Sequence, residues 1–333
     1  MKNAVAIDLG SANTVIYQVG GGVVLSEPSV VAFDVGSKKK VKAVGKEAKN
    51  IIGKTADGTE IVFPIVKGQI VDEKAAGAMV ENFLNKISTN KFGLRPQVLL
   101  SIPCGLDNAE IKQYERAFNS AGVYGIDFVE SPILSALGSD APITTSTPCF
   151  IIDIGGGSTN IAAVSLDGVI AGVNIGIGGN SIDATIIKCV EREYGLKIGS
   201  LTAEKLKISI GSLYENEVNY AQINGRDIAG GKPRSVTVPS GKIYSPIKHV
   251  LDKIFEVADM VMSKLPAEVS AEIRSNGVYL AGGTAKIPGV AEYFSRTMAI
   301  RANLAEYPDL ANAIGGSKVA ANHSLLKKVR IHA

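Results

Sequence analysis

The sequence contains no tryptophan, and cysteine and histidine occur only three times each. The cysteines show neither CxxC spacing nor a paired histidine, so we expect reduced thiols in a cytosol rather than a disulfide framework. The histidines are too scattered to indicate a metal site. The residues concerned are Cys104, Cys149, Cys189, His249, His323 and His332.

Net charge and long apolar runs are also small. The chain has 35 basic and 32 acidic residues, a formal charge of +3, which is too little to indicate nucleic-acid binding. No stretch of about 20 uninterrupted apolar residues could span a membrane. Asp8 interrupts the only apolar stretch near the N-terminus, so we recognise no signal peptide. We therefore expect a cytoplasmic protein with no direct nucleic-acid partner.

What the chain does have is length and a balanced α/β composition. Its 333 residues suffice for two domains, each with a core, and 46% of them are apolar while 20% are charged. Strand-like runs alternate with helical periodicity. Helices are expected at 73–89, 107–121, 182–194, 202–210, 246–264, 267–275, 290–298 and 309–327, and a β-rich stretch at 214–245; a further helix opens at Ser131, with Pro132 in its first turn. Asp107 or Asn108 would cap the second helix and Thr202 the fourth.

A strand that runs into an aspartate and three glycines stands out at residues 149–161. Four apolar residues precede Asp153, then come Gly155, Gly156 and Gly157, followed by Ser158 and Thr159. Glycines permit a tight turn whose backbone N–H groups approach an anion closely. A carboxylate at the mouth of such a turn suits hydrated Mg²⁺, which takes few protein ligands. The motif predicts a phosphate-and-metal site.

The same pattern occurs once before, at residues 5–17, where Asp8 ends an apolar strand and Gly10 and Ser11 follow. One glycine-rich hairpin alone is a weak signal, because ordinary tight turns look alike. Two copies separated by about one domain length indicate an internal duplication. We expect two phosphate-binding hairpins that face one another across a cleft.

These motifs resemble the ATPase superfamily of actin, the large heat-shock chaperones and the sugar kinases, and most closely the bacterial actins of the MreB type. Residues 8–14 and 153–159 match the two phosphate loops, and residues 277–284 match the adenosine loop. More specific to the MreB type are Pro64, Gly68, Ile70 and Asp72, together with residues 177–179 and 202–211. The resemblance covers nearly the whole chain.

The resemblance implies an α/β, duplicated actin-like (ribonuclease H-like) fold of two domains with a nucleotide cleft between them. Domain I would comprise residues 1–144 plus 309–333, with a small subdomain at about 34–72. Domain II would comprise residues 145–308, with a small subdomain at about 182–246. ATP or ADP with Mg²⁺ would be the cofactor.

The resemblance also assigns the nucleotide site residue by residue. Asp8 and Asp153 would orient Mg²⁺ through water. Glu204 and Lys207 would face the ribose and adenine, although a surface ion pair between them is an alternative reading. The complete set of expected nucleotide-binding residues is Gly10, Ser11, Ala12, Asn13, Gly155, Gly156, Gly157, Ser158, Gly178, Glu204, Lys207, Gly282, Gly283 and Thr284, the last three opening a helix.

The residues expected to support hydrolysis depart from the pattern of the family that the chain resembles. MreB-like proteins usually carry two glutamates before the proline that matches Pro132, and the second helps to position the attacking water. Here the pair is Glu130 and Ser131, and Ser158 replaces a usual threonine. A hydroxyl is a poor base at neutral pH, so we expect slow or altered ATP turnover unless Glu130 takes over. Ser131 is otherwise explained as a helix N-cap.

The resemblance further implies head-to-tail filaments, with paired protofilaments, of a cell-shape scaffold. Phe92 and Leu94, flanked by basic residues, would touch the inner membrane face, unless they fold back into the domain. Membrane-bound morphogenesis or organelle proteins are possible partners. Departures at Ser131 and Asn180 keep magnetosome positioning and plasmid segregation open as roles. A small-molecule kinase of the same superfamily is a further alternative.

Overall fold

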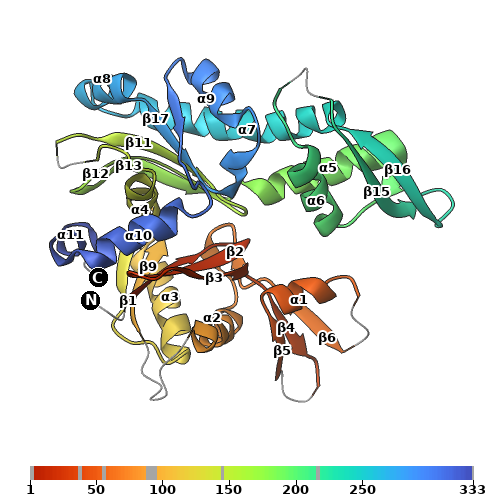
Figure 1. Cartoon of the computed structure of the whole chain (residues 1–333), viewed down its shortest axis with the longest axis horizontal. Helices are drawn as coiled ribbons and strands as arrows, with labels where there is room; N and C mark the ends of the chain where they lie inside the picture. The colour runs from red at the N-terminus through yellow and green to blue at the C-terminus, as the bar shows by residue number, and fades with distance from the viewer. Residues whose placement is uncertain are drawn as a thin grey trace.

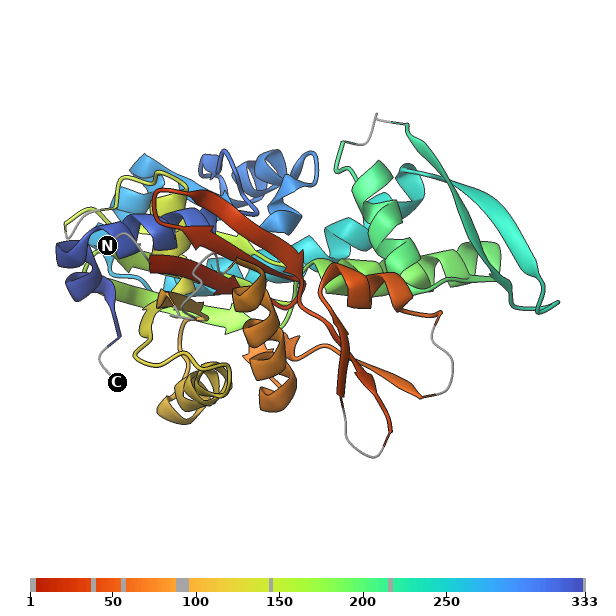
Figure 2. The same cartoon turned by 60° about the horizontal axis from the view of Figure 1, so that its bottom comes forward.

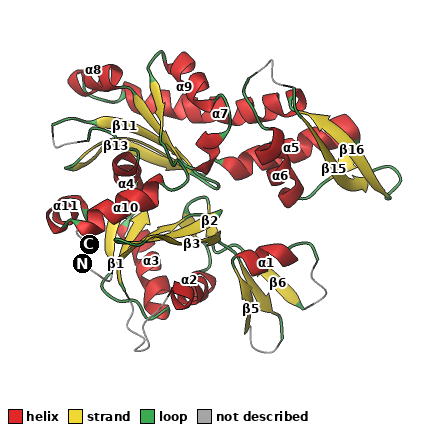
Figure 3. Ribbon diagram, viewed as in Figure 1, coloured by secondary structure: helices red, strands yellow, loops and turns green. Residues whose placement is uncertain are grey.

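A computed structural model describes residues 4–36, 40–54, 58–87, 96–143, 146–214 and 218–331. Two five-stranded sheets form its framework, each carrying a smaller extension on the same side (Figure 1). Within these residues, no helix combines the length and apolar character that a membrane span requires. Each layer of the framework consists either of helices or of strands, which Figure 3 shows in red and yellow.

The first sheet has the strand order β10-β9-β1-β2-β3, and the second has the order β18-β17-β11-β12-β13. In each sheet the first three strands in sequence form an antiparallel meander, and the later two lie parallel to the first. The bounds are β1 Ala4–Leu9, β2 Asn13–Gln18, β3 Gly22–Pro28, β9 Gln97–Ile102, β10 Asp127–Glu130, β11 Cys149–Ile154, β12 Thr159–Ser165, β13 Gly168–Ile175, β17 Val278–Ala281 and β18 Ala302–Leu304.

The two sheets agree in detail as well as in order. The register between the second and third strands shifts between Ile16 and Tyr17 in the first sheet, and between Ala163 and Val164 in the second. The two bulges lie on the same pair of strands in each meander, two residues apart in matching positions, and each increases the local twist. The predicted duplication and the actin-like fold class are confirmed.

Helices cover the outer face of each sheet and fill the space between the sheets. On the first sheet, α2 (Glu73–Ile87) and α3 (Asn108–Ser120) pack over one core; on the second, α7 (Gly241–Ser263), α8 (Ala267–Asn276) and α9 (Val290–Met298) pack over another. Between the sheets lie α4 (Ser131–Gly138), α10 (Ala311–Ala321) and α11 (His323–Val329), around a third core (Figure 1). Apolar burial on both faces therefore holds the two sheets together.

The central helices α4 and α10 cross at glycines. A side chain at Gly138 would clash with the Ala311 carbonyl, and one at Gly315 would clash with the Leu134 carbonyl. Because glycine has no Cβ, the two backbones come into direct contact. This crossing fixes the first residues of both helices beside the ends of β1 and β11.

The smaller extensions each contain a three-stranded sheet. The first has the order β5-β4-β6 with α1, and the second has the order β14-β15-β16 with α5 and α6; Figure 2 shows both extending away from the large sheets. Their bounds are β4 Val31–Asp34, β5 Lys40–Val44, α1 Lys46–Ile51, β6 Thr59–Val62, α5 Gly179–Tyr194, β14 Leu196–Lys197, α6 Ser200–Ile210, β15 Tyr220–Asp227 and β16 Pro233–Pro239. A two-stranded hairpin, β7 (Ile65–Val66) and β8 (Gln69–Ile70), follows β6.

Several local predictions are corrected. The fourth predicted helix begins at Ser200 after Gly199, not at a Thr202 cap. The helix predicted at 246–264 begins earlier, at Gly241, so Pro246 lies inside it. The single helix expected at 309–327 is two, since Asn322 leaves the helical conformation and caps α11 with its side chain. The cap at Asp107 is confirmed, with a reciprocal bond to Glu110.

Candidate functional site

The two glycine-rich turns meet face to face. A Cβ at Gly156 would clash with the Ala12 side chain, and one at Gly157 would clash with Ser11. The second turn therefore needs its glycines because the first turn's side chains fill that space. Within the turns, Gly155 N–H donates to the Ser158 carbonyl at 2.9 Å. This bond fixes the backbone of the second turn, and both turns lie next to one opening.

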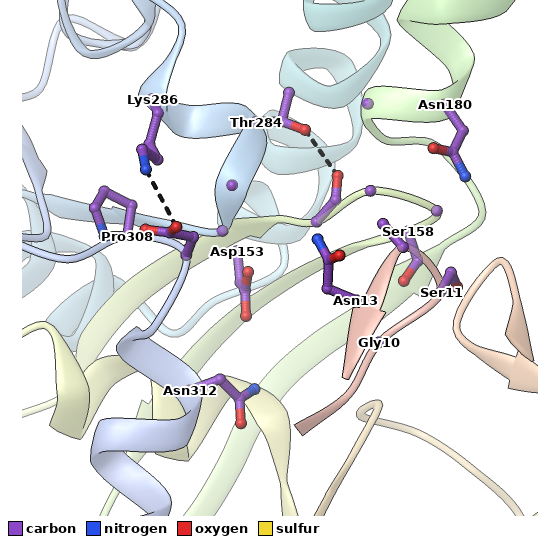
Figure 4. Close-up of a pocket in the computed structure, with 18 of the residues that line it drawn as sticks. Gly10, Ser11, Asn13, Asp153, Ser158, Asn180, Thr284, Lys286, Pro308 and Asn312 are labelled. Atoms are coloured by element: carbon purple, nitrogen blue, oxygen red, sulfur yellow. Dashed lines mark hydrogen bonds and ion pairs between the residues drawn. The ribbon is translucent and has the colours of Figure 1, made fainter. Parts of the chain in front are cut away.

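That opening is a cavity of about 490 Å³ between the halves of the molecule (Figure 4). Most residues of the predicted site lie on its wall: Asp8, Gly10, Ser11, Ala12, Asn13, Ser131, Asp153, Gly155, Gly156, Gly157, Ser158, Glu204, Lys207, Gly282, Gly283 and Thr284. The volume falls within the range of small-molecule pockets.

Two predicted residues do not line the cavity. Gly178 lies behind the second turn, where a Cβ would be 2.6 Å from the Gly155 carbonyl oxygen, and it is the N-cap of α5. Glu130 accepts a hydrogen bond from the Gly105 N–H at 3.2 Å, and burial raises the pKa of its carboxyl. Glu130 is also the N-cap of α4, so Ser131 is the first helical residue and the N-cap explanation of Ser131 is wrong.

Asp8 and Asp153 form the negatively charged floor of the cavity. Burial, followed by the charge of Asp153, raises the pKa of Asp8 from 3.8 to about 7. Burial also raises the pKa of Asp153, while hydrogen bonds from Ser135 and Asn312 act in the opposite direction. Two desolvated carboxylates of like charge are costly unless a cation offsets them.

The donor set of this floor fits hydrated Mg²⁺. The described residues contain no group of three or more His, Cys, Asp or Glu that could hold a metal ion together. A cation bound by Asp8 and Asp153 would therefore keep mainly water ligands. Mg²⁺ does this in phosphate sites, whereas Zn²⁺ and Ca²⁺ take more protein ligands.

The turn after β17 forms another wall of the cavity, beside Asp153 and the second glycine-rich turn. Thr284 Oγ1 donates to the Gly155 carbonyl at 2.8 Å, and Lys286 pairs with Asp309 at 3.1 Å (Figure 4). The expected helix at Gly282 is only a four-residue 3₁₀ turn, η1 (Gly283–Lys286). Backbone N–H groups are present here, but a long helix with a macrodipole is not.

Glu204 and Lys207 reach the cavity from α6, but each has a partner elsewhere. Lys207 Nζ lies 2.8 Å from Asp183 and donates to the Gly179 carbonyl at 3.1 Å. Glu204 pairs with Lys49 of α1 at 2.7 Å, which joins the two small extensions across the cleft. The alternative of a simple Glu204–Lys207 surface pair is not what the structure has.

The sequence analysis missed the turn between β7 and β8. Gly68 N–H donates to Ser11 Oγ at 3.0 Å, and Tyr114 Oη donates to the Gly68 carbonyl at 2.6 Å. Gly68 has a φ of 81° and lies 2.8 Å, at its Cβ position, from Ser158 Oγ. It was noted only as a family feature. Its position shows that this hairpin contacts both glycine-rich turns.

Polar residues of α4 and α10 were missed as well. Asn312 and Ser135 are buried, Asn312 lines the cavity, and Ser135 Oγ donates to Asp153 at 2.6 Å. A buried asparagine in the apolar run at 309–316 was the available signal. The predicted membrane residues Phe92 and Leu94 lie outside the described residues.

Comparisons with known proteins agree with this geometry. A family model described as MreB/Mbl protein matches residues 2–328. The cell shape-determining protein MreB of Escherichia coli K12 is 35% identical over 323 residues, which cover 95% of this chain and 93% of that protein.

Solved structures give the same relationship. MreB5 of Spiroplasma citri bound to AMPPNP has a TM-score of 0.90 and 29% identity, covering 99% of this chain and 98% of that one. The same protein bound to ADP gives 0.91 and 30% at the same coverage.

Proposed function

The chain belongs to the MreB/Mbl family of actin homologues, and from this premise we propose that it binds ATP between its halves and polymerises into filaments. The observation that carries the proposal is the meeting of two glycine-rich turns above two buried carboxylates, in a cavity of about 490 Å³. Backbone N–H groups of both turns would hold the phosphates, and the end near Thr284 and Ile208 would receive the nucleoside.

Mg²⁺ belongs to this proposal. When bound, it would neutralise phosphate charge and the charge of the floor. Asp8 and Asp153 would hold it through water molecules. The raised pKa values of both carboxyls support the need for a cation, because the ionised pair is otherwise costly in this buried position.

ATP hydrolysis would be slow. Ser131 lines the cavity, whereas the carboxylate of Glu130 is occupied by the Gly105 N–H. Ser158 also lines the cavity from the second turn. The side chain at position 131 is a hydroxyl and not a carboxylate, and losing such acid–base help costs about 10²–10⁴-fold in rate.

Filament formation as a cell-shape scaffold is the cellular role we propose. The MreB of Escherichia coli, at 35% identity, is named as cell shape-determining, which supports this role over organelle positioning or plasmid segregation. Subunits would associate head to tail, a heterologous contact that does not close, and the resulting protofilaments would pair. Asp107, near the end of β9, caps α3, which weakens the kinase alternative because a kinase needs a free catalytic carboxylate.

Association with the inner face of the membrane is a further part of the proposal. It rests on the sequence alone, where Phe92 and Leu94 are flanked by Lys91 and Arg95. Two apolar tips with adjacent cations favour an anionic surface only weakly, so filament avidity would have to add to it. Binding to anionic vesicles that is lost in Phe92→Ser/Leu94→Ser would support this part.

The proposal as a whole is tested by calorimetry and electron microscopy. Purified protein should take up ATP with Mg²⁺ in a one-to-one ratio and form filaments above a critical concentration. Absence of nucleotide uptake would overturn the proposal. Uptake without assembly at high protein concentration would leave the nucleotide site standing and remove the polymer.

A further inference from the structure

Ser29 lies between β3 and β4, where the first extension begins, and it contacts the first glycine-rich turn (Figure 1). The residue is only 1% exposed and does not line the cavity. Its Oγ donates to the Gly10 carbonyl at 2.6 Å, and its backbone N–H donates to the Ala12 carbonyl at 3.0 Å. Because the hydroxyl proton is used in this way, Thr14 Oγ1 is the donor in its 2.9 Å contact with Ser29 Oγ. One buried residue thus holds two carbonyls of the turn.

These two bonds determine where the neighbouring N–H groups point. In a planar trans peptide, the carbonyl and the N–H of the following residue point in opposite directions. Holding the Gly10 carbonyl toward Ser29 therefore directs the Ser11 N–H away from Ser29. The bond to the Ala12 carbonyl does the same for the Asn13 N–H. Both donors belong to residues that line the cavity, so they face the side where the phosphates would lie.

The second turn is held in the same manner by backbone groups. The Gly155 carbonyl accepts from the Gly179 N–H at 3.0 Å, and the Gly156 carbonyl accepts from the Asn180 N–H at 2.7 Å. In both halves the donors come from the segment that follows the third strand, which is β13 in the second half and β3 in the first. The first half differs because one of its two donors is a side chain, the Ser29 hydroxyl. A substitution can remove that donor without changing the backbone.

We propose that Ser29 is the positioning residue of the first phosphate-binding turn, an inference that rests on the proposed function. Its hydroxyl keeps the Gly10 carbonyl out of the cavity, so that the turn presents N–H groups to the phosphates. Without the hydroxyl, the buried carbonyl loses its donor, which is costly, and rotation of the peptide toward water in the cavity relieves that cost. A carbonyl oxygen in this position repels the anion that the N–H groups attract. Ser29 therefore acts on the nucleotide through the turn.

The test uses the full-length protein with ATP and Mg²⁺. Ser29→Ala should lower the ATP affinity about tenfold in calorimetry, the effect expected for a buried carbonyl that has lost its donor. Thr14→Val should lower it by no more than about threefold, because the bond from Ser29 to Gly10 remains. Hydrogen exchange of the ATP-bound protein gives a second readout. In Ser29→Ala, the amides of residues 8–14 should exchange faster, while those of residues 153–159 should exchange as in wild type.

Ser165 provides a matched control. It is also buried, at 7% exposure, and its Oγ accepts from the Asp167 N–H at 3.1 Å. It ends β12, whose first residue, Thr159, adjoins the second turn, so Ser165 lies at the far end of that strand. Ser165→Ala should leave the ATP affinity unchanged. If Ser29→Ala fails to fold, Ser29→Cys carries the test, because a thiol is a weak donor and the affinity should then fall about threefold.

Each result decides for or against the role of Ser29. An ATP affinity within threefold of wild type in Ser29→Ala overturns the inference, as does an unchanged affinity in Ser29→Cys where that variant replaces it. Faster exchange in both turns, or an equal loss of affinity in Ser165→Ala, also overturns it, because the effect would then be a general loss of structure. Wild-type protein that binds no ATP overturns the proposed function itself.

Discussion

The turns that follow β1 and β11 occupy corresponding places in two sheets of the same strand order, but their side chains differ. The first turn carries the side chains of Ser11 and Ala12. The second turn has Gly157 and Gly156 opposite them, and the side chains of the first turn occupy the positions where Cβ atoms of the second turn would lie. The two sheets hold the turns in equivalent positions, whereas the side chains of the two turns are complementary in size. Residues at matching positions of the two halves should therefore tolerate substitution very differently.

The two floor carboxylates differ in the same sense. Asp153 accepts from Ser135 and has Asn312 beside it, whereas Asp8 is dominated by burial and by the charge of Asp153. One carboxylate is thus held by neutral hydrogen-bond donors, whereas the pKa of the other is raised by burial and by its charged neighbour. Asp8 and Asp153 therefore lie in different surroundings, although they occupy matching positions in the two sheets.

Lys207→Met gives the largest expected effect. Lys207 and Asp183 form an ion pair inside the second half, with side chains only 12% and 9% exposed. Removing the ammonium leaves a buried carboxylate uncompensated, so the free energy of unfolding should fall by about 3 kcal/mol. Urea denaturation measures the loss. A second change, Asp183→Asn, should recover part of it by removing the stranded charge.

Gly157→Ala tests the complementarity of the turns directly. The added methyl clashes with Ser11, and overpacking of this kind costs about 1–3 kcal/mol. ATP affinity should fall by about tenfold or more, as measured by calorimetry. Ser11→Gly in the same chain should restore most of it. A Gly157→Ala protein that binds ATP normally would contradict the view that the turns interlock.

Asp8 should make stability depend on pH in nucleotide-free, metal-free protein. Because its pKa is raised from 3.8 to about 7, the folded protein keeps a proton between those values that the unfolded chain has lost. Stability therefore falls as the pH rises through this window. From pH 6 to pH 8 the Asp8 contribution is about 1 kcal/mol, so Asp8→Asn should gain that much relative to wild type.

Asp153→Asn is the internal comparison for that experiment. Its pKa is also raised by burial, while the bonds from Ser135 and Asn312 favour its ionised form, so its gain as the pH rises should have the same direction as that of Asp8→Asn. Thermal and urea denaturation at both pH values provide the measurement. Equal gains from the two variants would mean that the carboxylates are equivalent.

Lys49→Met gives the smallest expected effect. Lys49 crosses from the first half to Glu204 at 2.7 Å, and the two side chains are 33% and 30% exposed. A pair this accessible to solvent contributes about 0.5 kcal/mol. Stability should change by no more than that, and dissociation of ATP, followed by fluorescence, should become about twofold faster. A loss as large as that of Lys207→Met would remove the contrast between buried and exposed pairs.

The sequence allowed the duplicated framework and the two turns to be predicted, because strand runs, glycines and aspartates are local signals. The cap at Asp107 and the proline in the first turn of α4 were local as well. The partners of Lys207 and Glu204 were not predictable, since Lys49 is 155 residues from Glu204 and only the fold brings them together. Asn312 was missed for the same reason.

Pro246 shows why the start of α7 could not be predicted from local sequence signals. Proline is expected at a helix start, yet α7 continues through it, because burial of Ile243 and Ile247 on the same face outweighs the lost backbone bond. The hairpin at Gly68 was underestimated because its importance comes from Ser11 and Tyr114, neither of which is near it in sequence.

The glycine contacts between α4 and α10 have a mechanical consequence. If one half of the protein turns against the other about this crossing, atoms are displaced in proportion to their distance from it. Ser131 and Asn312 lie on the two crossing helices, whereas α1 and α6 lie far out on the extensions (Figure 1). Such a rotation would separate α1 from α6 at the mouth of the cleft by a large distance, while the contact between Ser131 and Asn312, which lies close to the rotation axis, would hardly change.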